Sequence, residues 1–122
     1  LIKNTNVDSL APAIGNMHGI YKVKPNINFK TIKEISEETN LPLVLHGSSN
    51  LTDEDIKKSI ECGICKININ TDLQIAWSKA VRQYLEKNKK AYDPRKIISS
   101  GEFNIKKYIK DKLQLLGNSN RL

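Results

Sequence analysis

Two histidines stand out in this sequence because each directly precedes a glycine at the end of an apolar run. They are His18, followed by Gly19, and His46, followed by Gly47, and the chain has 2 histidines in all. Their spacing matches about one strand–helix–strand unit, so neighbouring parallel strands would bring the two imidazoles together. Imidazole is a common zinc ligand, and a catalytic zinc site uses three protein groups and one open position. The spacing alone leaves a metal site and ordinary hydrogen-bonded loop histidines equally open.

Small and polar residues at two of the strand ends suit an anion. Gly47, Ser48 and Ser49 offer backbone N–H groups and hydroxyls without bulk, as phosphate cradles do. The run from Asn68 to Thr71 leads into the N-terminus of a long predicted helix, where free N–H groups and the helix dipole favour negative charge. For Thr71 alone, an N-cap is the better interpretation. A phosphate held between two such loops is a known use of the last strands of a barrel.

The elements that must position these residues alternate between strands and helices. Apolar runs predict buried strands over residues 7–15, 43–45 and 64–69, although Pro12 argues against a central position for the first. Thr52, with Asp55 three residues later, predicts a capped helix start. Apolar side chains at helical spacing predict helices over 29–39, from 52 to Gly63, over a long stretch after 71, from Pro94, and through 105–116.

This alternation predicts an α/β fold built on a parallel sheet, with roughly twenty to thirty residues in each strand–helix unit. The chain has 122 residues, whereas a complete eight-unit barrel needs about 250. The pattern therefore predicts either a half-barrel or a minimal open sheet. The first residue is Leu1 rather than Met, so we expect a piece of something larger.

The composition and charge of the chain indicate which kinds of partner and which cellular compartment to expect. The 20 Lys and Arg against 13 Asp and Glu give a net charge of +7, but the lysines are dispersed and few aromatics lie between them. We therefore expect a solvated basic surface and no nucleic-acid partner. No long apolar run or secretory leader is visible, and Cys62 and Cys65 are too few for a disulfide framework and are expected to be buried. We expect a cytoplasmic protein with no membrane partner.

Four segments together resemble the C-terminal part of the class II, zinc-dependent ketose-bisphosphate aldolases, a family that includes the fructose- and tagatose-bisphosphate enzymes. They are residues 13–19 (AIGNMHG), 41–49 (LPLVLHGSS), 63–68 (GICKIN) and 92–96 (YDPRK). They follow the family's order over essentially the whole chain. That family is a (β/α)8 TIM barrel, so the resemblance implies an α/β fold in which residues 1–122 are strands six to eight with their helices.

The resemblance also implies roles for individual residues. His18 and His46 match two of the three zinc ligands. Substrate-binding positions of the family are matched by Gly19, Gly47, Ser48, Ser49, Asn68, Ile69, Asn70 and Thr71. Zinc polarises the carbonyl of a fructose or tagatose 1,6-bisphosphate and stabilises the enediolate left by cleavage to dihydroxyacetone phosphate and glyceraldehyde 3-phosphate. A monovalent cation, Na⁺ or K⁺, lies beside the phosphate in this family, and family members are commonly homo-oligomers.

The sequence departs from the family pattern in two ways. The third zinc histidine and the proton-donating aspartate lie near the end of the family's third strand, and no matching segment occurs here, so we expect this chain to be inactive alone. Ser48 stands where the family has Gly or Ala, and Asn50 stands where it has Gly. Asn16 and Met17 stand where Thr and Ala are usual. Two alternatives stay open: a degenerate non-catalytic paralogue, and a basic α/β module for anions or nucleic acid.

Overall fold

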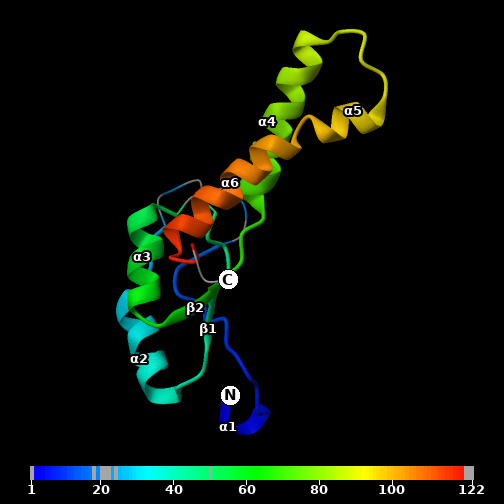
Figure 1. Cartoon of the computed structure of the whole chain (residues 1–122). Helices are drawn as coiled ribbons and strands as arrows, with labels where there is room; N and C mark the ends of the chain where they lie inside the picture. Colours follow the sequence, from blue (N-terminus) through cyan, green and yellow to red (C-terminus); the bar gives the residue numbers. More distant parts are fainter. Residues whose placement is uncertain (1, 18, 20–22, 24, 50, 120–122) are drawn as a thin grey trace. The chain divides into compact units, whose positions relative to one another are not determined.

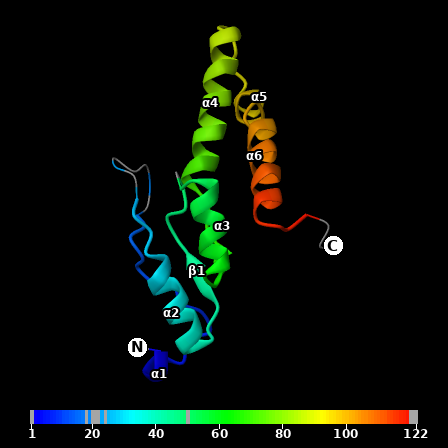
Figure 2. The same cartoon turned by 90° about the vertical axis from the view of Figure 1, so that its left-hand side faces the viewer.

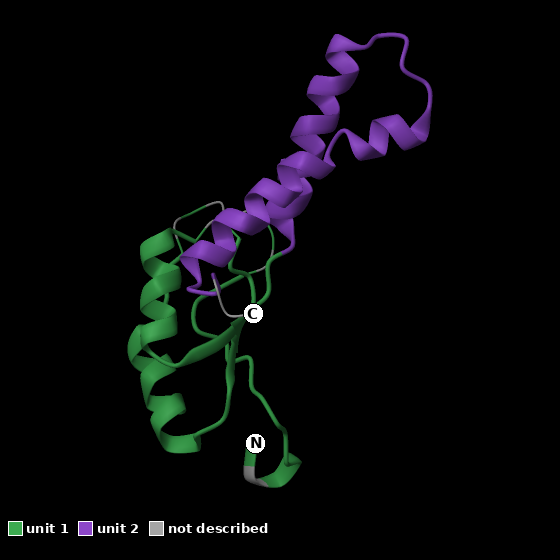
Figure 3. Ribbon diagram, viewed as in Figure 1, with its two compact units in different colours: residues 1–69 green, residues 70–122 purple. Residues whose placement is uncertain are grey.

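The structure is a computed structural model that describes residues 2–17, 19, 23, 25–49 and 51–119 (Figure 1). The chain divides into two compact units, Leu1–Ile69 and Asn70–Leu122 (Figure 3). The first contains a short helix α1, Ile2–Thr5, two further helices and a parallel sheet, and the second is helical. The predicted α/β class is confirmed. No helix in the described part of the chain is both long and apolar enough to span a bilayer.

The parallel sheet of the first unit has five of the predicted site residues, His46–Ser49 and Asn68, in the segments that follow its two strands. Strand β1, Leu43–Leu45, pairs in parallel with β2, Ile64–Ile67. Leu10 forms a single parallel bridge to Leu43, and its carbonyl accepts from the Val44 N–H at 2.8 Å. All three residues of β1 are buried, as a strand flanked on both sides requires.

Two of the predicted strands are shorter in the structure. In the segment 7–15, the sheet includes Leu10 alone, because Pro12 has no N–H with which to continue a ladder. Strand β2 ends at Ile67, two residues before the predicted end. The Asn68 N–H still donates to the Leu45 carbonyl at 3.0 Å, but the Asn68 carbonyl accepts from a serine hydroxyl instead of a strand N–H.

Helices α2, Phe29–Thr39, and α3, Asp53–Glu61, pack on each other, and α3 packs on β2. The predicted cap of α3 is confirmed, since Thr52 Oγ1 accepts from the Asp55 N–H at 3.1 Å. Gly63 follows the end of α3 with a φ of +117°. The core of this unit is fully buried at Ile14, Ile32, Leu43, Leu45 and Ile56.

The prediction that both cysteines are buried is wrong. Cys62, at the end of α3, is half-buried, Cys65 in β2 is exposed, and both are free thiols. Because β2 is the edge of the described two-stranded sheet, one side of it has no neighbouring strand to cover Cys65.

The second unit is made of α4, Thr71–Lys87, α5, Pro94–Ser99, and α6, Glu102–Leu115, all close to their predicted positions. Helix α6 runs alongside α4 in both views (Figures 1 and 2). Trp77 of α4 donates from Nε1 to the Ile98 carbonyl at 3.1 Å. A Cβ at Gly101 would lie 2.0 Å from Trp77 Cδ1, so only glycine lets the indole pack there.

Candidate functional site

Three chain segments meet at the carboxyl end of the sheet in the first unit. The Asn16 side chain donates from Nδ2 to the His46 carbonyl at 2.6 Å. The Ser48 hydroxyl donates to the Asn68 carbonyl at 2.9 Å. A Cβ at Gly47 would lie 2.1 Å from the Met17 carbonyl oxygen. The structure therefore brings together the segments that follow Ile14, β1 and β2, as expected for parallel strands.

His46 is half-buried, and its ring is held by the segment that follows β2. Its Nε2 lies 3.3 Å from the Asn68 Nδ2, a contact whose donor depends on the tautomer of the ring. Histidines that bind metals commonly have such a second partner, which fixes the ring orientation and tautomer. His46 therefore fits the role of a metal ligand.

The other predicted zinc ligand, His18, lies outside the described residues, so the structure places one of the two imidazoles. Within the described ranges, no group of three or more His, Cys, Asp or Glu side chains is arranged to hold a metal ion.

The predicted anion-binding segment after β1 is compact and buried. Ser48 and Ser49 are buried, although both are polar. Gly47 has a φ of +59°, which glycine adopts at little cost, and its missing side chain admits the backbone of Met17. Gly19 also has a positive φ, +86°. Backbone N–H groups, hydroxyls and glycines of this kind suit an anion.

The second predicted anion-binding segment is divided between the two units. Asn68 and Ile69 end the first unit, and Asn70 and Thr71 begin the second. The N-cap of α4 is Asn70, not Thr71 as predicted, because the Asn70 carbonyl already accepts from the Gln74 N–H at 3.1 Å. Its side chain makes no capping hydrogen bond in the structure as described.

Asn16 is a positioning residue that sequence reasoning missed. Besides holding His46, it accepts the Ile14 N–H on Oδ1 at 3.1 Å, which fixes the orientation of its amide. Asn is a common loop residue because its side chain can bond the nearby backbone. Nothing in the sequence indicates the hydrogen bond from Asn16 to the His46 carbonyl.

We expect Asn16→Asp to destabilise the first unit by about 1–3 kcal/mol, because a carboxylate oxygen would face the His46 carbonyl without a hydrogen to donate. Urea unfolding followed by far-ultraviolet circular dichroism measures the change. Asn26→Asp, an exposed change of the same charge in the same unit, should stay within about 0.5 kcal/mol. Equal effects of the two substitutions would show that charge, and not the link to His46, matters.

The segment 92–96 of the second unit is held by an ion pair. Asp93 caps α5 by accepting the Arg95 N–H, and its two carboxylate oxygens accept from Arg95 Nε and Nη2, each at 3.0 Å. These hydrogen bonds from Arg95, first from its side chain and then from its backbone, lower the pKa of Asp93 below its usual value.

In parallel α/β folds, ligands bind at the carboxyl ends of the strands, where this chain has buried serines and a histidine. The family model described as "Fructose-bisphosphate aldolase class-II" matches residues 1–121. The chain therefore belongs to the class II fructose-bisphosphate aldolase family.

Individual relatives agree with this assignment. The chain is 47% identical over 121 residues to the fructose-bisphosphate aldolase of Staphylococcus epidermidis, covering 99% of this chain and 42% of the relative. Among solved structures, the YdjI aldolase of Escherichia coli K12 has a TM-score of 0.77 and 32% identity, covering 98% of this chain and 43% of that one. The fructose-bisphosphate aldolase of Campylobacter jejuni has a TM-score of 0.74 and 28% identity, covering 89% and 39%. The chain thus spans less than half the length of these relatives.

Proposed function

We propose that this chain supplies part of the active site of a zinc-dependent aldolase that cleaves or forms a ketose 1,6-bisphosphate, fructose or tagatose. The products of cleavage would be dihydroxyacetone phosphate and glyceraldehyde 3-phosphate. The observation that carries the proposal is the meeting of His46, Ser48 and Asn68 at one end of a parallel sheet. Within the barrel, the Leu10 segment, β1 and β2 would be strands six, seven and eight, and residues 1–122 the C-terminal part.

In this proposal, His18 and His46 hold the zinc ion, which acts as a Lewis acid on the ketose carbonyl. Asn68 keeps the His46 ring in one orientation through its contact with Nε2. Asn16 holds the backbone of His46 from the other side. The third zinc ligand and the proton donor come from residues that this sequence does not contain, so the chain alone is inactive.

The phosphate of the substrate would be bound by two groups of residues, with a monovalent cation, Na⁺ or K⁺, beside it. The first group is Gly19, Gly47, Ser48 and Ser49, whose small or absent side chains would let an anion come close to the backbone. The second group is Asn68, Ile69, Asn70 and Thr71, which leads into the N-terminus of α4. We further propose a homo-oligomer in the cytoplasm with a phosphosugar as its small-molecule partner.

Phosphate binding by the chain itself tests this proposal. We expect inorganic phosphate at millimolar concentration to shift the amide resonances of residues 47–49 and 68–71 in a saturable way. A dissociation constant of about 1 mM corresponds to a binding free energy of only about 4 kcal/mol. Ser49→Ala should weaken phosphate binding, because it removes a hydroxyl group and hardly changes the volume of the side chain. Ser59→Ala removes the hydroxyl of another fully buried serine, in α3, and should leave binding unchanged.

Titration with sodium chloride at equal ionic strength controls for general charge effects. An intact chain that shows no shift at these residues at tens of millimolar phosphate would contradict the proposed phosphate site. The degenerate-paralogue alternative predicts phosphate binding without any cleavage after the missing part of the barrel is supplied.

A further inference from the structure

A carboxylate lies at the start of α4, directly after residues that the proposed function assigns to a phosphate. The second unit is otherwise strongly basic. Residues 70–122 contain 12 Lys or Arg and 5 Asp or Glu, against 8 and 8 in residues 1–69, so the net charge of +7 lies in the second unit. Of these acidic residues, Asp72 is the one in the first turn of α4, next to Asn70 and Thr71. The proposed function gives this carboxylate no role.

The Asp72 carboxylate and a phosphate would be attracted to the same end of α4. A negative charge in the first turn of a helix interacts favourably with the N–H groups and the dipole there. An unrestrained carboxylate at this position would therefore compete with a phosphate for these groups and repel it. The side chain of the N-cap residue, Asn70, makes no capping hydrogen bond in the structure as described, so it does not take the place of a ligand. Whatever holds Asp72 thus affects how well α4 receives a phosphate.

Tyr108 of α6 holds this carboxylate. Its hydroxyl donates to Asp72 Oδ2 at 2.6 Å, across 36 residues of the chain. This distance is typical of hydrogen bonds from a hydroxyl to a charged oxygen, which are roughly twice as strong as those between neutral groups. Both side chains are half-buried. The ammonium of Lys112, one turn later in α6, lies 5.7 Å from the centre of the Tyr108 ring, a cation–π contact that does not involve the hydroxyl.

We propose that Tyr108 is a positioning residue of the phosphate site at the start of α4. By donating to Asp72, its hydroxyl keeps the carboxylate on the side of α6 and off the first-turn N–H groups, which remain for the phosphate at Asn70 and Thr71. Tyr108 acts through Asp72 and does not itself touch the phosphate. This proposal rests on the proposed function, because it names what keeps that site open to an anion.

Titration of the 122-residue chain with inorganic phosphate, followed through the amide shifts of residues 70 and 71, tests the proposal. We expect Tyr108→Phe to weaken phosphate binding about threefold, because the released carboxylate interacts with the start of the helix in place of the ligand. This variant keeps the aromatic ring and its contact with Lys112, and removes only the hydroxyl. Asp72→Asn removes the charge but keeps an oxygen that accepts from Tyr108, and should not weaken binding.

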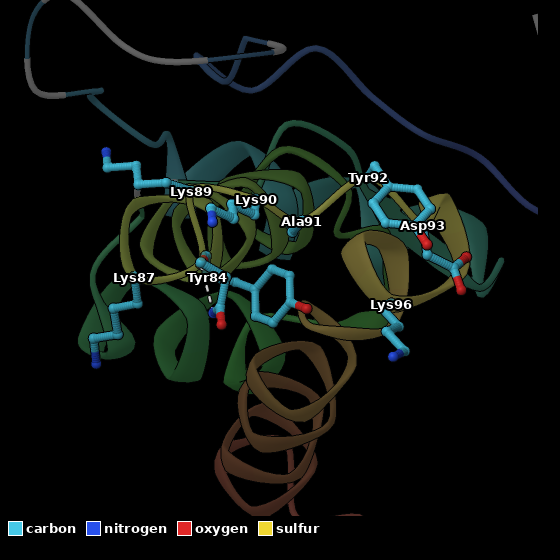
Figure 4. A pocket seen from close by; sticks show the side chains of 9 residues that line it. Tyr84, Lys87, Lys89, Lys90, Ala91, Tyr92, Asp93 and Lys96 are labelled. Carbon is cyan, nitrogen blue, oxygen red and sulfur yellow. Dashed lines mark hydrogen bonds between the residues drawn. The ribbon is translucent and has the colours of Figure 1, made fainter.

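Tyr84→Phe is the matched control. Tyr84 is another half-buried tyrosine of the second unit, and its ring lines the hollow between the end of α4 and α5, which Lys96 also lines (Figure 4). Removing its hydroxyl should leave the shifts of residues 70 and 71 and their phosphate dependence unchanged. The emission of Trp77, which packs against Gly101, shows whether the second unit stays folded in each variant.

The double variant Tyr108→Phe with Asp72→Asn separates charge from packing. If the hydroxyl acts by restraining the carboxylate, Asp72→Asn restores the phosphate binding that Tyr108→Phe loses. If the hydroxyl only ties α6 to α4, its loss weakens binding equally with and without Asp72→Asn, since the asparagine oxygen would still accept from it.

Restored binding in the double variant supports the proposal. It is overturned if Tyr108→Phe binds phosphate as the unchanged chain does, if the double variant stays as weak as Tyr108→Phe, or if Tyr84→Phe weakens binding to the same extent. A loss of Trp77 packing in Tyr108→Phe would also overturn it, because the hydroxyl would then act on the fold. Failure of the proposed phosphate site is a distinct result: the unchanged chain would show no saturable shift at residues 47–49 and 68–71, and the positioning role would fall with it.

Discussion

Residues 1–122 with added zinc are expected to show no detectable cleavage of fructose or tagatose 1,6-bisphosphate. The chain has 2 histidines, and a catalytic zinc site uses three protein ligands, so metal binding should be weak. The proton donor of the proposed mechanism is not among these residues, and such a group typically contributes a factor of about 10² to 10⁴ in rate. Binding the phosphate without polarising the carbonyl does not lower the barrier. Enzyme-coupled detection of dihydroxyacetone phosphate measures the result.

Activity should appear when this chain is joined to the part of the Staphylococcus epidermidis aldolase that it does not match. In that chimera, His46→Ala should lower kcat/KM by more than about 10²-fold, because loss of even an outer partner of a metal ligand costs up to that factor. Zinc content after dialysis should fall with it, and the amide spectrum shows whether the fold persists. Chelator-sensitive cleavage by residues 1–122 alone, or a fully active His46→Ala chimera, would disprove this assignment of the site.

Gly47→Ala is expected to destabilise the first unit by about 2–5 kcal/mol. Two costs add: a φ of +59° strains any residue with a Cβ, and that Cβ would lie 2.1 Å from the Met17 carbonyl oxygen. Urea unfolding followed by far-ultraviolet circular dichroism measures the total. The segment after Ile14 would have to move away from β1, so phosphate binding at residues 47–49 should be lost as well.

Gly19→Ala separates the backbone strain of a positive φ from the steric collision of an added Cβ. Gly19 has a φ of +86°, but a Cβ there would meet none of the described residues within 4 Å. This variant should therefore cost only the strain, about 1–2 kcal/mol. If the two alanine variants are equally stable, close approach of Met17 to Gly47 does not contribute to stability.

Local signals in the sequence predicted most of the elements. Thr52 and Asp93 mark helix starts through their own side chains, and α2, β1 and α4 were predicted within a few residues of their ends. These features depend on residues within one helical turn of each other, so their causes are contained in a short stretch of sequence.

The features that the sequence did not predict depend on residues far apart in the chain. Leu10 joins the sheet at one point because Pro12 ends the ladder, and the exposure of Cys65 follows from the edge position of β2. The links from Asn16 to His46 and from Asn68 to His46 span 30 and 22 residues. Composition predicted the basic character of the chain, but not that the charge is confined to residues 70–122.

The packing of Trp77 against Gly101 has a practical consequence for spectroscopy. The chain contains 1 tryptophan, and this indole lies between α4 and the start of α6, with its N–H on the Ile98 carbonyl. Its emission wavelength therefore reports on loosening of α4 from α5 and from the start of α6. Fluorescence excited at 295 nm would follow the unfolding of the second unit. Substitutions in the first unit, such as Gly47→Ala, would not change this emission as long as the helices of the second unit stay packed.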